Sequence, residues 1–226
     1  MIEERDLPAL EAAVQALADE LAAALREAIS ARGRATAAVS GGRTPTAVFR
    51  RMRGVELNWS RLTLTLTDER WVPAGHPESN EGLARSELLR GAAAAATFVP
   101  LFGGEDSPEA GRPGCEARLQ ALPLPFDAVY LGMGADGHFA SLFPGDEALE
   151  ARQGRCIPVP AARSRLPRMS LTAPTLLDAR RIFLLLSGPE KRAAYTRARQ
   201  AGAYREVPLR VVLQQETTPV VVIRAP

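Results

Sequence analysis

The sequence predicts an α/β fold in which a mostly parallel, Rossmann-like sheet is covered by helices on both faces. Short apolar runs rich in β-forming residues alternate with helical segments along most of the 226 residues, a pattern typical of three-layer parallel sheets. Charged or glycine-rich loops follow several of the apolar runs. In such folds these loops meet at one edge of the sheet, where ligands bind. We therefore expect a single domain, residues 1–226, with one site at that edge.

Composition is that of a globular protein without a strong preference in charge. Hydrophobic residues make up 46% and charged residues 24%, and the net charge of +2 indicates no class of ligand. The acidic start lacks the basic region of an export signal, and no apolar run reaches the roughly 18 residues of a membrane span. The two cysteines and two histidines match no usual metal-ligand spacing. We expect a cytoplasmic protein without a metal site or membrane partner.

The spacing of apolar residues and the positions of glycine and proline predict the helices and strands. An Ala-rich helix is predicted from Leu7 to Arg32, because apolar residues recur every three or four positions and Gly33 follows. Further helical segments are predicted at 47–52, 83–89, 174–179, 188–200 and 208–214. Strands are predicted at 35–39, 62–67, 97–102, 126–130, 155–160, 168–172, 181–187 and 220–224. The helix expected within 105–122 should be broken or short, because Gly111, Pro113 and Gly114 interrupt it.

The first candidate site is a loop between strand 35–39 and the next helix. It combines two glycines, three hydroxyls and an arginine at a helix N-terminus, where free backbone amides and the helix dipole bind anions. Ordinary capping by Thr44, with Pro45 as first helical residue, is the alternative. Capping needs only one hydroxyl and no glycine pair, so we favour phosphate binding. The predicted phosphate-binding residues are Ser40, Gly41, Gly42, Arg43 and Thr44.

Charged groups follow other strands. Asp68, Glu69 and Arg70 come directly after strand 62–67, although such pairs of carboxylates usually belong to solvated loops. The third loop contains Ser79 and Asn80, either of which could cap the following helix.

Lys191, the only lysine of the chain, lies in the first turn of helix 188–200. A cation is mildly unfavourable there, because the N-terminal end of a helix prefers an acid. Lys191 is therefore solvated, paired with Glu190, or close to a bound anion.

The central stretch of the chain, residues 131–144, follows strand 126–130. It contains three glycines and, two positions apart, Asp136 and His138. An imidazole beside a carboxylate at this edge indicates acid–base chemistry, with a structurally satisfied histidine as an equal alternative. The spacing Gly132-x-Gly-x-x-Gly137 also matches a dinucleotide fingerprint. We reject that interpretation, because Pro144 cuts the required helix short and no carboxylate follows about 20 positions on.

Five motifs together resemble the 6-phosphogluconolactonase family, and they occur in the order typical of that family. They are Ser40-Gly-Gly-Arg-Thr-Pro45, Thr67-Asp-Glu-Arg-Trp-Val-Pro73, Ser79-Asn-Glu-Gly82, Gly132-x-Gly-x-Asp-Gly-His-x-Ala-Ser141 and Ser187-Gly-x-x-Lys191. Glucosamine-6-phosphate deaminases of the same superfamily share the Asp-Gly-His core. They typically have Asp-Glu-Tyr where this chain has Asp68-Glu69-Arg70, and Phe-Asn-Glu where it has Ser141-Leu142-Phe143. Both differences favour the lactonase.

The resemblance implies hydrolysis of 6-phosphoglucono-1,5-lactone to 6-phosphogluconate in the oxidative pentose phosphate pathway, without a metal or organic cofactor. A lactone is an activated ester and needs no covalent nucleophile, so we expect His138 to act first as base and then as acid. Asp136 is expected to orient His138 or the attacking water.

The remaining site residues are expected to bind the substrate. The loop from Ser40 to Thr44 would hold the phosphate, with Arg43 and Lys191 as charged donors. Arg70 and Arg168 are candidates for the phosphate or for the oxyanion at the carbonyl. Asp68 and Asn80 would order this edge or contact sugar hydroxyls.

Two alternative functions stay open at this stage. One is a glucosamine-6-phosphate deaminase or isomerase. The other is a non-catalytic sugar-phosphate sensor, but such proteins usually carry a DNA-binding segment for which this chain has no spare residues. We therefore expect a monomer that acts on a small sugar-phosphate lactone and has no nucleic-acid partner.

Overall fold

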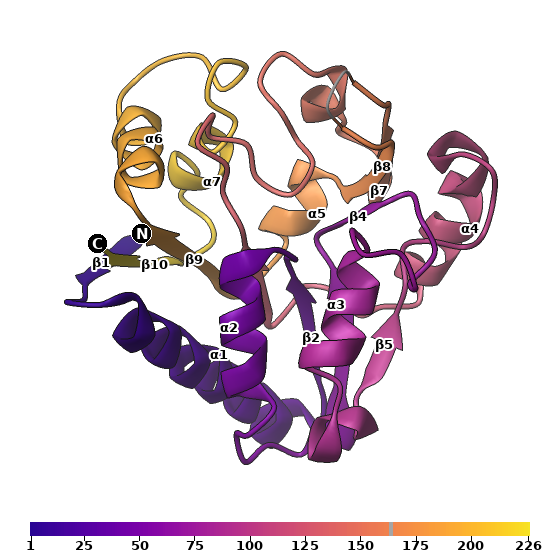
Figure 1. The fold of residues 1–226 in the computed structure, drawn as a ribbon, viewed down its shortest axis with the longest axis vertical. Helices are drawn as coiled ribbons and strands as arrows, with labels where there is room; N and C mark the ends of the chain where they lie inside the picture. Colours follow the sequence, from indigo (N-terminus) through magenta and orange to yellow (C-terminus); the bar gives the residue numbers. More distant parts are fainter. Residues whose placement is uncertain (163–164) are drawn as a thin grey trace.

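The apolar runs of the sequence form a seven-stranded sheet (Figure 1). In the computed structural model, which describes residues 1–162 and 165–226, its strands lie in the order β1-β10-β9-β6-β2-β3-β5, and every neighbouring pair is parallel. The strands are β1 (Ile2–Asp6), β2 (Ala35–Val39), β3 (Leu62–Leu66), β5 (Thr97–Val99), β6 (Ala128–Leu131), β9 (Ile182–Ser187) and β10 (Val220–Ala225). β2 and β6 are buried along their whole length, as expected of strands covered on both faces.

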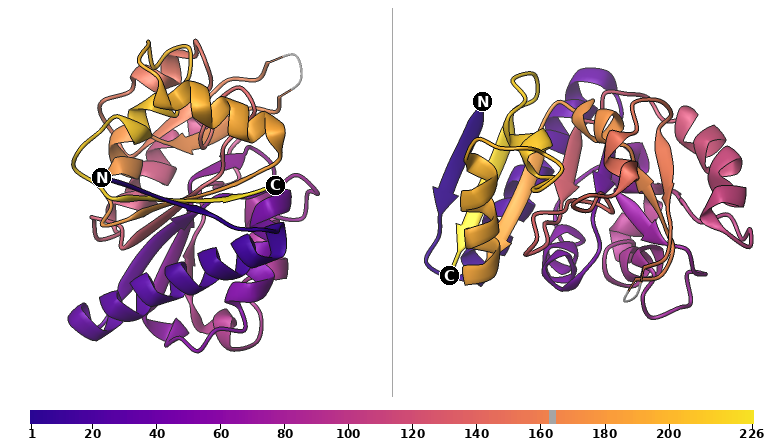
Figure 2. Two further views of the ribbon diagram at one scale, coloured as in Figure 1. Left: turned by 90° about the vertical axis from the view of Figure 1, so that its left-hand side faces the viewer. Right: turned by 90° about the horizontal axis from the view of Figure 1, so that it is seen from above.

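Helices cover both faces of the sheet, which confirms the predicted α/β architecture (Figure 2). One face carries α1 (Leu10–Arg32), α2 (Arg43–Met52) and α3 (Asn80–Glu87), and the other carries α6 (Pro189–Arg199) and α7 (Arg210–Leu213). The predicted apolar stripe of α1 faces the core, where Leu17, Leu21 and Leu25 are buried. The helix begins at Leu10, three residues later than predicted, and ends at Gly33 in the left-handed conformation.

A second, antiparallel sheet of three strands was not predicted. It consists of β4 (Asp68–Arg70), β8 (Arg168–Leu171) and β7 (Cys156–Val159), in that order. Asp68 and Glu69 therefore do not belong to a solvated loop: both are buried within β4. The pairing of β4 with β8 brings Arg168 opposite Arg70, although almost a hundred positions separate them in the chain.

The remaining elements complete the covering layers. α5 (Ala173–Leu177) follows β8, and short 3₁₀ turns lie at Trp59–Arg61, Gly91–Ala95 and Glu147–Glu150. The edge strand β1 was also missed, because four of its five residues are charged. Ion pairs of Arg224 on β10 with Glu4 (2.8 Å) and Asp6 (2.6 Å) help to attach it.

The helix expected to be broken is the continuous α4 (Pro108–Gln120). Ser107 caps it by accepting a hydrogen bond from the Ala110 amide, and Pro108 takes the first turn, where proline is tolerated. Gly111 is buried against Trp71, whose indole nitrogen donates to the Glu105 carbonyl oxygen at 2.7 Å. Packing against its neighbours thus outweighs the poor helix propensity of this segment.

Gly111→Ala is expected to destabilise the protein. A Cβ atom at this position would lie 2.2 Å from the buried Trp71 ring, and the overpacking cost of roughly 1–3 kcal/mol exceeds the gain in helix propensity of about 1 kcal/mol. Gly114→Ala in the same helix is the matched control, because its Cβ would meet only the flexible ends of Glu105 and Arg118. Urea unfolding should show a loss for Gly111→Ala and none for Gly114→Ala; equal behaviour of the two variants would contradict this packing argument.

Candidate active site

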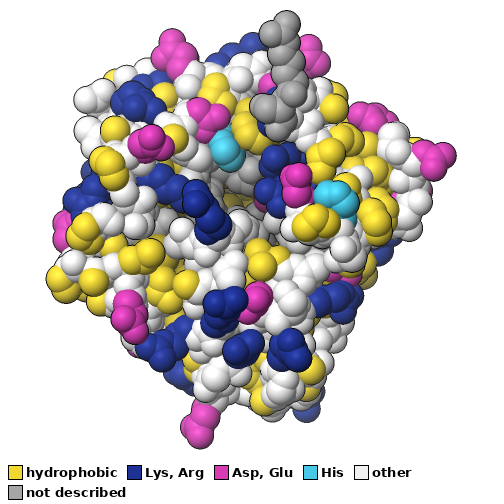
Figure 3. All heavy atoms as spheres, in the orientation of Figure 1, with side chains coloured by type: hydrophobic (Ala, Val, Ile, Leu, Met, Phe, Trp, Pro, Cys, Tyr) yellow, Lys and Arg dark blue, Asp and Glu magenta, His cyan; other side chains and the backbone are white. Residues whose placement is uncertain are grey.

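The candidate site lies where the connections of the large sheet reverse direction. From β2 the sheet grows outward through β3 and β5, and from its neighbour β6 it grows the other way through β9 and β10. The loops that follow β2 and β6 therefore diverge and leave a crevice at the carboxyl edge of the strands. A pocket of about 460 Å³ opens there, and Figure 3 shows it as a hollow surrounded by Lys and Arg side chains. Its size suits a small polar ligand.

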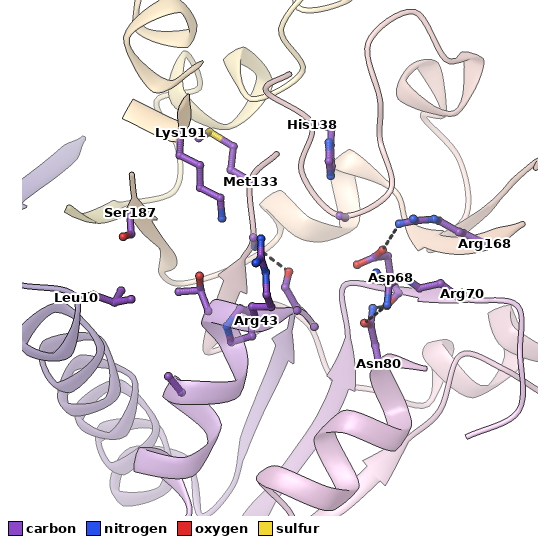
Figure 4. Close-up of a pocket in the computed structure, with 18 residues that line it drawn as sticks. Leu10, Arg43, Asp68, Arg70, Asn80, Met133, His138, Arg168, Ser187 and Lys191 are labelled. Carbon is purple, nitrogen blue, oxygen red and sulfur yellow. Dashed lines mark hydrogen bonds and ion pairs between the residues drawn. The ribbon is translucent and has the colours of Figure 1, made fainter. Parts of the chain in front are cut away.

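The sequence-predicted site residues meet in this pocket (Figure 4). Its lining includes Ser40, Gly41, Gly42, Arg43, Thr44, Asp68, Arg70, Asn80, His138, Arg168 and Lys191. Asp136 lies outside the lining but contacts His138. Leu10, exposed at the start of α1, also lines the pocket.

The loop after β6 presents an imidazole that is held from one side. His138 Nδ1 lies 2.6 Å from Asp136 Oδ1, and the His138 amide donates to the same oxygen at 3.1 Å. Burial acts to raise the pKa of Asp136, but the hydrogen bond and charge of His138 outweigh it and place this pKa below its usual range. An ionised Asp136 can only accept, so Nδ1 carries the hydrogen, and in the neutral form of the imidazole the lone pair is on Nε2. The free nitrogen can therefore act as a base.

An aromatic ring packs against this imidazole. The rings of Phe143 and His138 lie 4.4 Å apart, and the guanidinium of Arg165 lies 3.8 Å from the centroid of the Phe143 ring. Arg165 is in turn paired with Asp146 at 3.0 Å. The orientation of His138 is thus fixed by packing as well as by Asp136. Sequence analysis did not identify Phe143 or Arg165 as supporting residues, because neither occurs in a spacing that predicts this contact.

The loop after β2 presents the N-terminus of α2. The helix begins at Arg43, and its N-cap is Gly42, whose φ of 123° suits glycine and which makes no side-chain capping bond. The alternative interpretation, capping by Thr44 before a helix that starts at Pro45, is therefore wrong. Thr44 instead lies in the first turn and lines the pocket. The first amides of α2 and this hydroxyl are groups suited to donate hydrogen bonds to an anion.

Two cations lie beside this helix terminus. Lys191 extends from the first turn of α6, and Arg43 from the start of α2 (Figure 4). Burial and the positive charge of Arg43 lower the pKa of Lys191. Among the residues that the structure describes, no ion pair links Lys191 to Glu190, so pairing with that neighbour does not explain its position. An anion placed between Lys191 and Arg43 would relieve their repulsion.

A second cationic group lies on β4 and β8. Arg70 Nη1 donates to the Glu78 carbonyl oxygen at 2.6 Å and to Asn80 Oδ1 at 3.0 Å, whereas Arg168 lies 3.7 Å from Asp68. Burial lowers the pKa of Arg168, and the attraction of Asp68 only partly opposes this. The Nε atoms of Arg70 and Arg168 are both buried without a hydrogen-bond partner among the described residues. Unsatisfied buried donors of this kind are suited to receive acceptor oxygens of a ligand.

Buried hydrogen bonds tie the two loops to β4. The Ser40 hydroxyl accepts from the Gly132 amide at 2.9 Å and bonds the Thr67 hydroxyl at 2.8 Å. Thr67 donates to Asp68 Oδ1 at 3.1 Å, so its single proton is used and the Ser40 proton must be directed at Thr67. Ser141 donates to Asp68 Oδ2 at 2.6 Å. Ser40 thus lines the pocket, while its hydroxyl proton serves to hold the loops together.

A family model described as glucosamine-6-phosphate isomerases/6-phosphogluconolactonase matches residues 8–221. The chain belongs to this family. It is 41% identical over 220 residues to the 6-phosphogluconolactonase of Rhizobium meliloti, with 95% of each chain covered. It is also 41% identical over 207 residues to that of Pseudomonas aeruginosa, covering 89% of this chain and 87% of the relative.

Solved structures of the family agree with this assignment. A crystal structure of a 6-phosphogluconolactonase from Shewanella baltica has a TM-score of 0.97 and 36% identity, covering 100% of this chain and 98% of that one. A monomeric glucosamine-6-phosphate deaminase has a TM-score of 0.82 but only 19% identity, covering 98% and 97% of the two chains. That second likeness shows the shared fold alone.

Within residues 1–162 and 165–226, no three or more His, Cys, Asp or Glu side chains are grouped so that they could hold a metal ion. The described helices include none with the length and apolarity needed to cross a bilayer.

Glu69 is a buried residue that sequence analysis did not place in the site. Its carboxylate is fully buried and accepts four hydrogen bonds from β4 and the N-terminus of α3. Burial raises its pKa to about 7, although the four donors oppose the shift. The sequence shows only a charged pair, Asp68-Glu69, and the donors to Glu69 become its neighbours through the fold.

Glu69 is expected to make the protein less stable as the pH rises from about 4.5 to 7. In that window the unfolded chain has lost the Glu69 proton while the folded protein keeps it, so raising the pH favours unfolding by about 3 kcal/mol in total. Urea unfolding of Glu69→Gln at several pH values should lack this decline. Glu87→Gln is the control. Arg50 lowers the pKa of Glu87, so the effect of Glu87 on the pH dependence of stability lies below this pH range. Equal slopes for Glu69→Gln and the unmodified protein would contradict the assignment.

Proposed function

We propose that this protein hydrolyses 6-phospho-D-glucono-1,5-lactone to 6-phospho-D-gluconate, a step of the oxidative pentose phosphate pathway. The observation that carries the proposal is that His138, oriented by Asp136, shares one pocket with the cationic helix terminus around Arg43 and Lys191. Relatives named 6-phosphogluconolactonase match nearly the whole chain, which supports the same activity here. We further propose that residues 1–226 act as one lactonase domain, because the lining of the pocket extends from Leu10 to Lys191 in the sequence. We also propose that the protein is a cytoplasmic monomer.

The phosphate end of the substrate is assigned to the start of α2. The amides of the Gly41-Gly42 loop, the Thr44 hydroxyl, and the charges of Arg43 and Lys191 surround this part of the pocket. Among the described residues, the lining contains the cations Arg43, Arg70, Arg168 and Lys191 and one carboxylate, that of Asp68. A dianionic phosphate suits the Arg43–Lys191 end best, because no carboxylate competes with it there.

The carbonyl end is assigned to Arg168. Arg168 Nη1 lies 3.3 Å from the Ser141 hydroxyl, and its guanidinium lies 5.4 Å from the ring of Phe143, which packs against His138. Arg168 therefore belongs to the same corner as the imidazole and can stabilise the oxyanion that develops at the carbonyl. Arg70, which is bonded to Asn80 on the other side, is assigned to binding of the sugar or phosphate.

Asp68 and Asn80 are assigned to ordering this edge of the pocket. Their hydrogen-bonding groups are engaged within the protein: Asp68 binds Thr67 and Ser141, and Asn80 binds the Asp68 carbonyl and Arg70. This use of their polar atoms favours the structural role over contact with sugar hydroxyls.

The proposed reaction needs one residue to move protons. His138 Nε2 takes a proton from water as the oxygen attacks the lactone carbonyl, and Arg168 stabilises the resulting oxyanion. When the tetrahedral intermediate collapses, the bond to the ring oxygen breaks and the imidazolium returns its proton to that oxygen. Asp136 stabilises the imidazolium and keeps Nε2 directed at the pocket.

Removal of the imidazole is expected to reduce turnover without unfolding the protein. His138→Ala should lower kcat for the lactone by about 10²–10⁴-fold, measured above spontaneous hydrolysis, because a general acid–base group contributes that much. Circular dichroism checks that the variant is folded. Near-normal turnover of the purified variant would remove His138 from the mechanism.

Release of ammonia from glucosamine 6-phosphate by the unmodified protein, without lactone hydrolysis, would favour the deaminase instead.

Removal of the only lysine is expected to weaken binding more than chemistry. Lys191→Ala should raise KM about tenfold or more, because a charge-assisted contact to phosphate contributes roughly 1.5–3 kcal/mol, and should change kcat little. Arg192→Ala is a suitable control: it removes the neighbouring cation on α6, which faces Asp6 at 3.9 Å and is absent from the pocket lining. A fall in kcat alone would show that the phosphate lies elsewhere.

A further inference from the structure

Glu69 holds two parts of the pocket wall through one carboxylate. Oε1 accepts from the Arg70 amide at 2.7 Å and the Asn80 amide at 2.8 Å. Oε2 accepts from the Ser79 hydroxyl at 3.0 Å and the Glu81 amide at 2.7 Å. All four partners donate, so the carboxylate can accept all four bonds once it is ionised, at a pH above its pKa of about 7. Two of them are first amides of α3, so Glu69 also interacts favourably with the positive end of that helix.

The side chains attached to these amides contact the pocket. Asn80 donates through Nδ2 to the Asp68 carbonyl oxygen at 2.8 Å and accepts at Oδ1 from Arg70 at 3.0 Å. The Asn80 side chain also packs against Gly41 so closely that a Cβ at position 41 would lie 1.9 Å from Oδ1. The position of Asn80 therefore determines how close the Gly41-Gly42 loop comes to β4.

We propose that Glu69 is a positioning residue for substrate binding: its carboxylate fixes α3 against β4 and thereby places Arg70 and Asn80 relative to the Gly41-Gly42 loop. Glu69 itself does not line the pocket and touches no substrate. This inference rests on the proposed lactonase function for its kinetic readout. His138 and Arg168 lie on other segments and do not bond Glu69, so the chemical step should be spared.

Glu69→Gln is the direct test. The amide nitrogen of Gln would face two of the four donors, so the clamp between β4 and α3 loosens while the size of the side chain is kept. KM for the lactone should rise about tenfold, and kcat should stay within about twofold, when both are measured well below the melting temperature of the variant. A purely structural role would lower the melting temperature and leave KM of the folded enzyme unchanged, and that result would overturn the proposal.

Glu81→Gln is the matched control. Glu81 lies beside the clamp, but its side chain pairs with Arg85 at 2.8 Å along the helix, and its amide contact to Glu69 does not depend on the side chain. Its KM should equal that of the unmodified enzyme. An equal rise of KM in both variants would show that the Glu69 carboxylate is not responsible.

Two further measurements test the positioning role of Glu69. If Glu69→Gln does not fold, Ser79→Ala removes one donor to Glu69 and should raise KM severalfold; an unchanged KM overturns the proposal. If the unmodified protein does not hydrolyse the lactone, the proposed function fails, and a crystal structure of Glu69→Gln decides the positioning role separately. Displacement of the Arg70 and Asn80 side chains would support the role, and unchanged positions would overturn it.

Discussion

The pocket depends on how the buried carboxylate of Asp68 is satisfied. A buried charge is costly unless hydrogen bonds and a partner charge compensate it, and here Thr67, Ser141 and Arg168 do so. These partners come from the end of β3, from the loop that carries His138, and from β8. One requirement, that Asp68 be paired, therefore joins the large sheet, the small sheet and the loop that carries His138. The carboxylate of the adjacent Glu69 is likewise satisfied by hydrogen bonds, here from the N-terminal amides of α3.

The charge of the pocket follows from this arrangement. Asp68 partly neutralises the Arg168 corner, and the nearby Arg165 is paired with Asp146. Among the residues that the structure describes, no carboxylate pairs with Arg43 or Lys191, and burial lowers the pKa of Lys191. The protein thus keeps an uncompensated positive charge at one end of the pocket. A ligand with a doubly charged group at one end and a weakly polar ester at the other matches this asymmetry.

The sequence allowed prediction of features whose cause is local or periodic. The parallel order of the layers and the loops at strand ends were predicted, because strand and helix periods place them. The charged residues that line the pocket were predicted from the loop motifs, whereas Leu10 and Met133 in the same lining were not predicted. Long-range pairing was not predicted. In the sequence β4 resembles a charged loop, because its partner strand β8 lies far along the chain. Glu69 likewise resembles a solvated residue, because the amides of α3 become its neighbours only in the folded protein. β1, with its run of charged residues, and α4, with Gly111 against Trp71, form for the same reason: distant partners outweigh local preference.

The edge strand β1 has a consequence for biosynthesis. Its partner is β10, and the bonded pair Asp6 and Arg224 are 218 positions apart in the chain. During translation β1 stays unpaired until residues 220–225 have left the ribosome, whereas β2, β3 and β6 can associate earlier. An exposed strand edge invites association with other chains, and charged side chains counter it. The run Glu3-Glu4-Arg5-Asp6 therefore protects the nascent chain during the interval before its own partner exists.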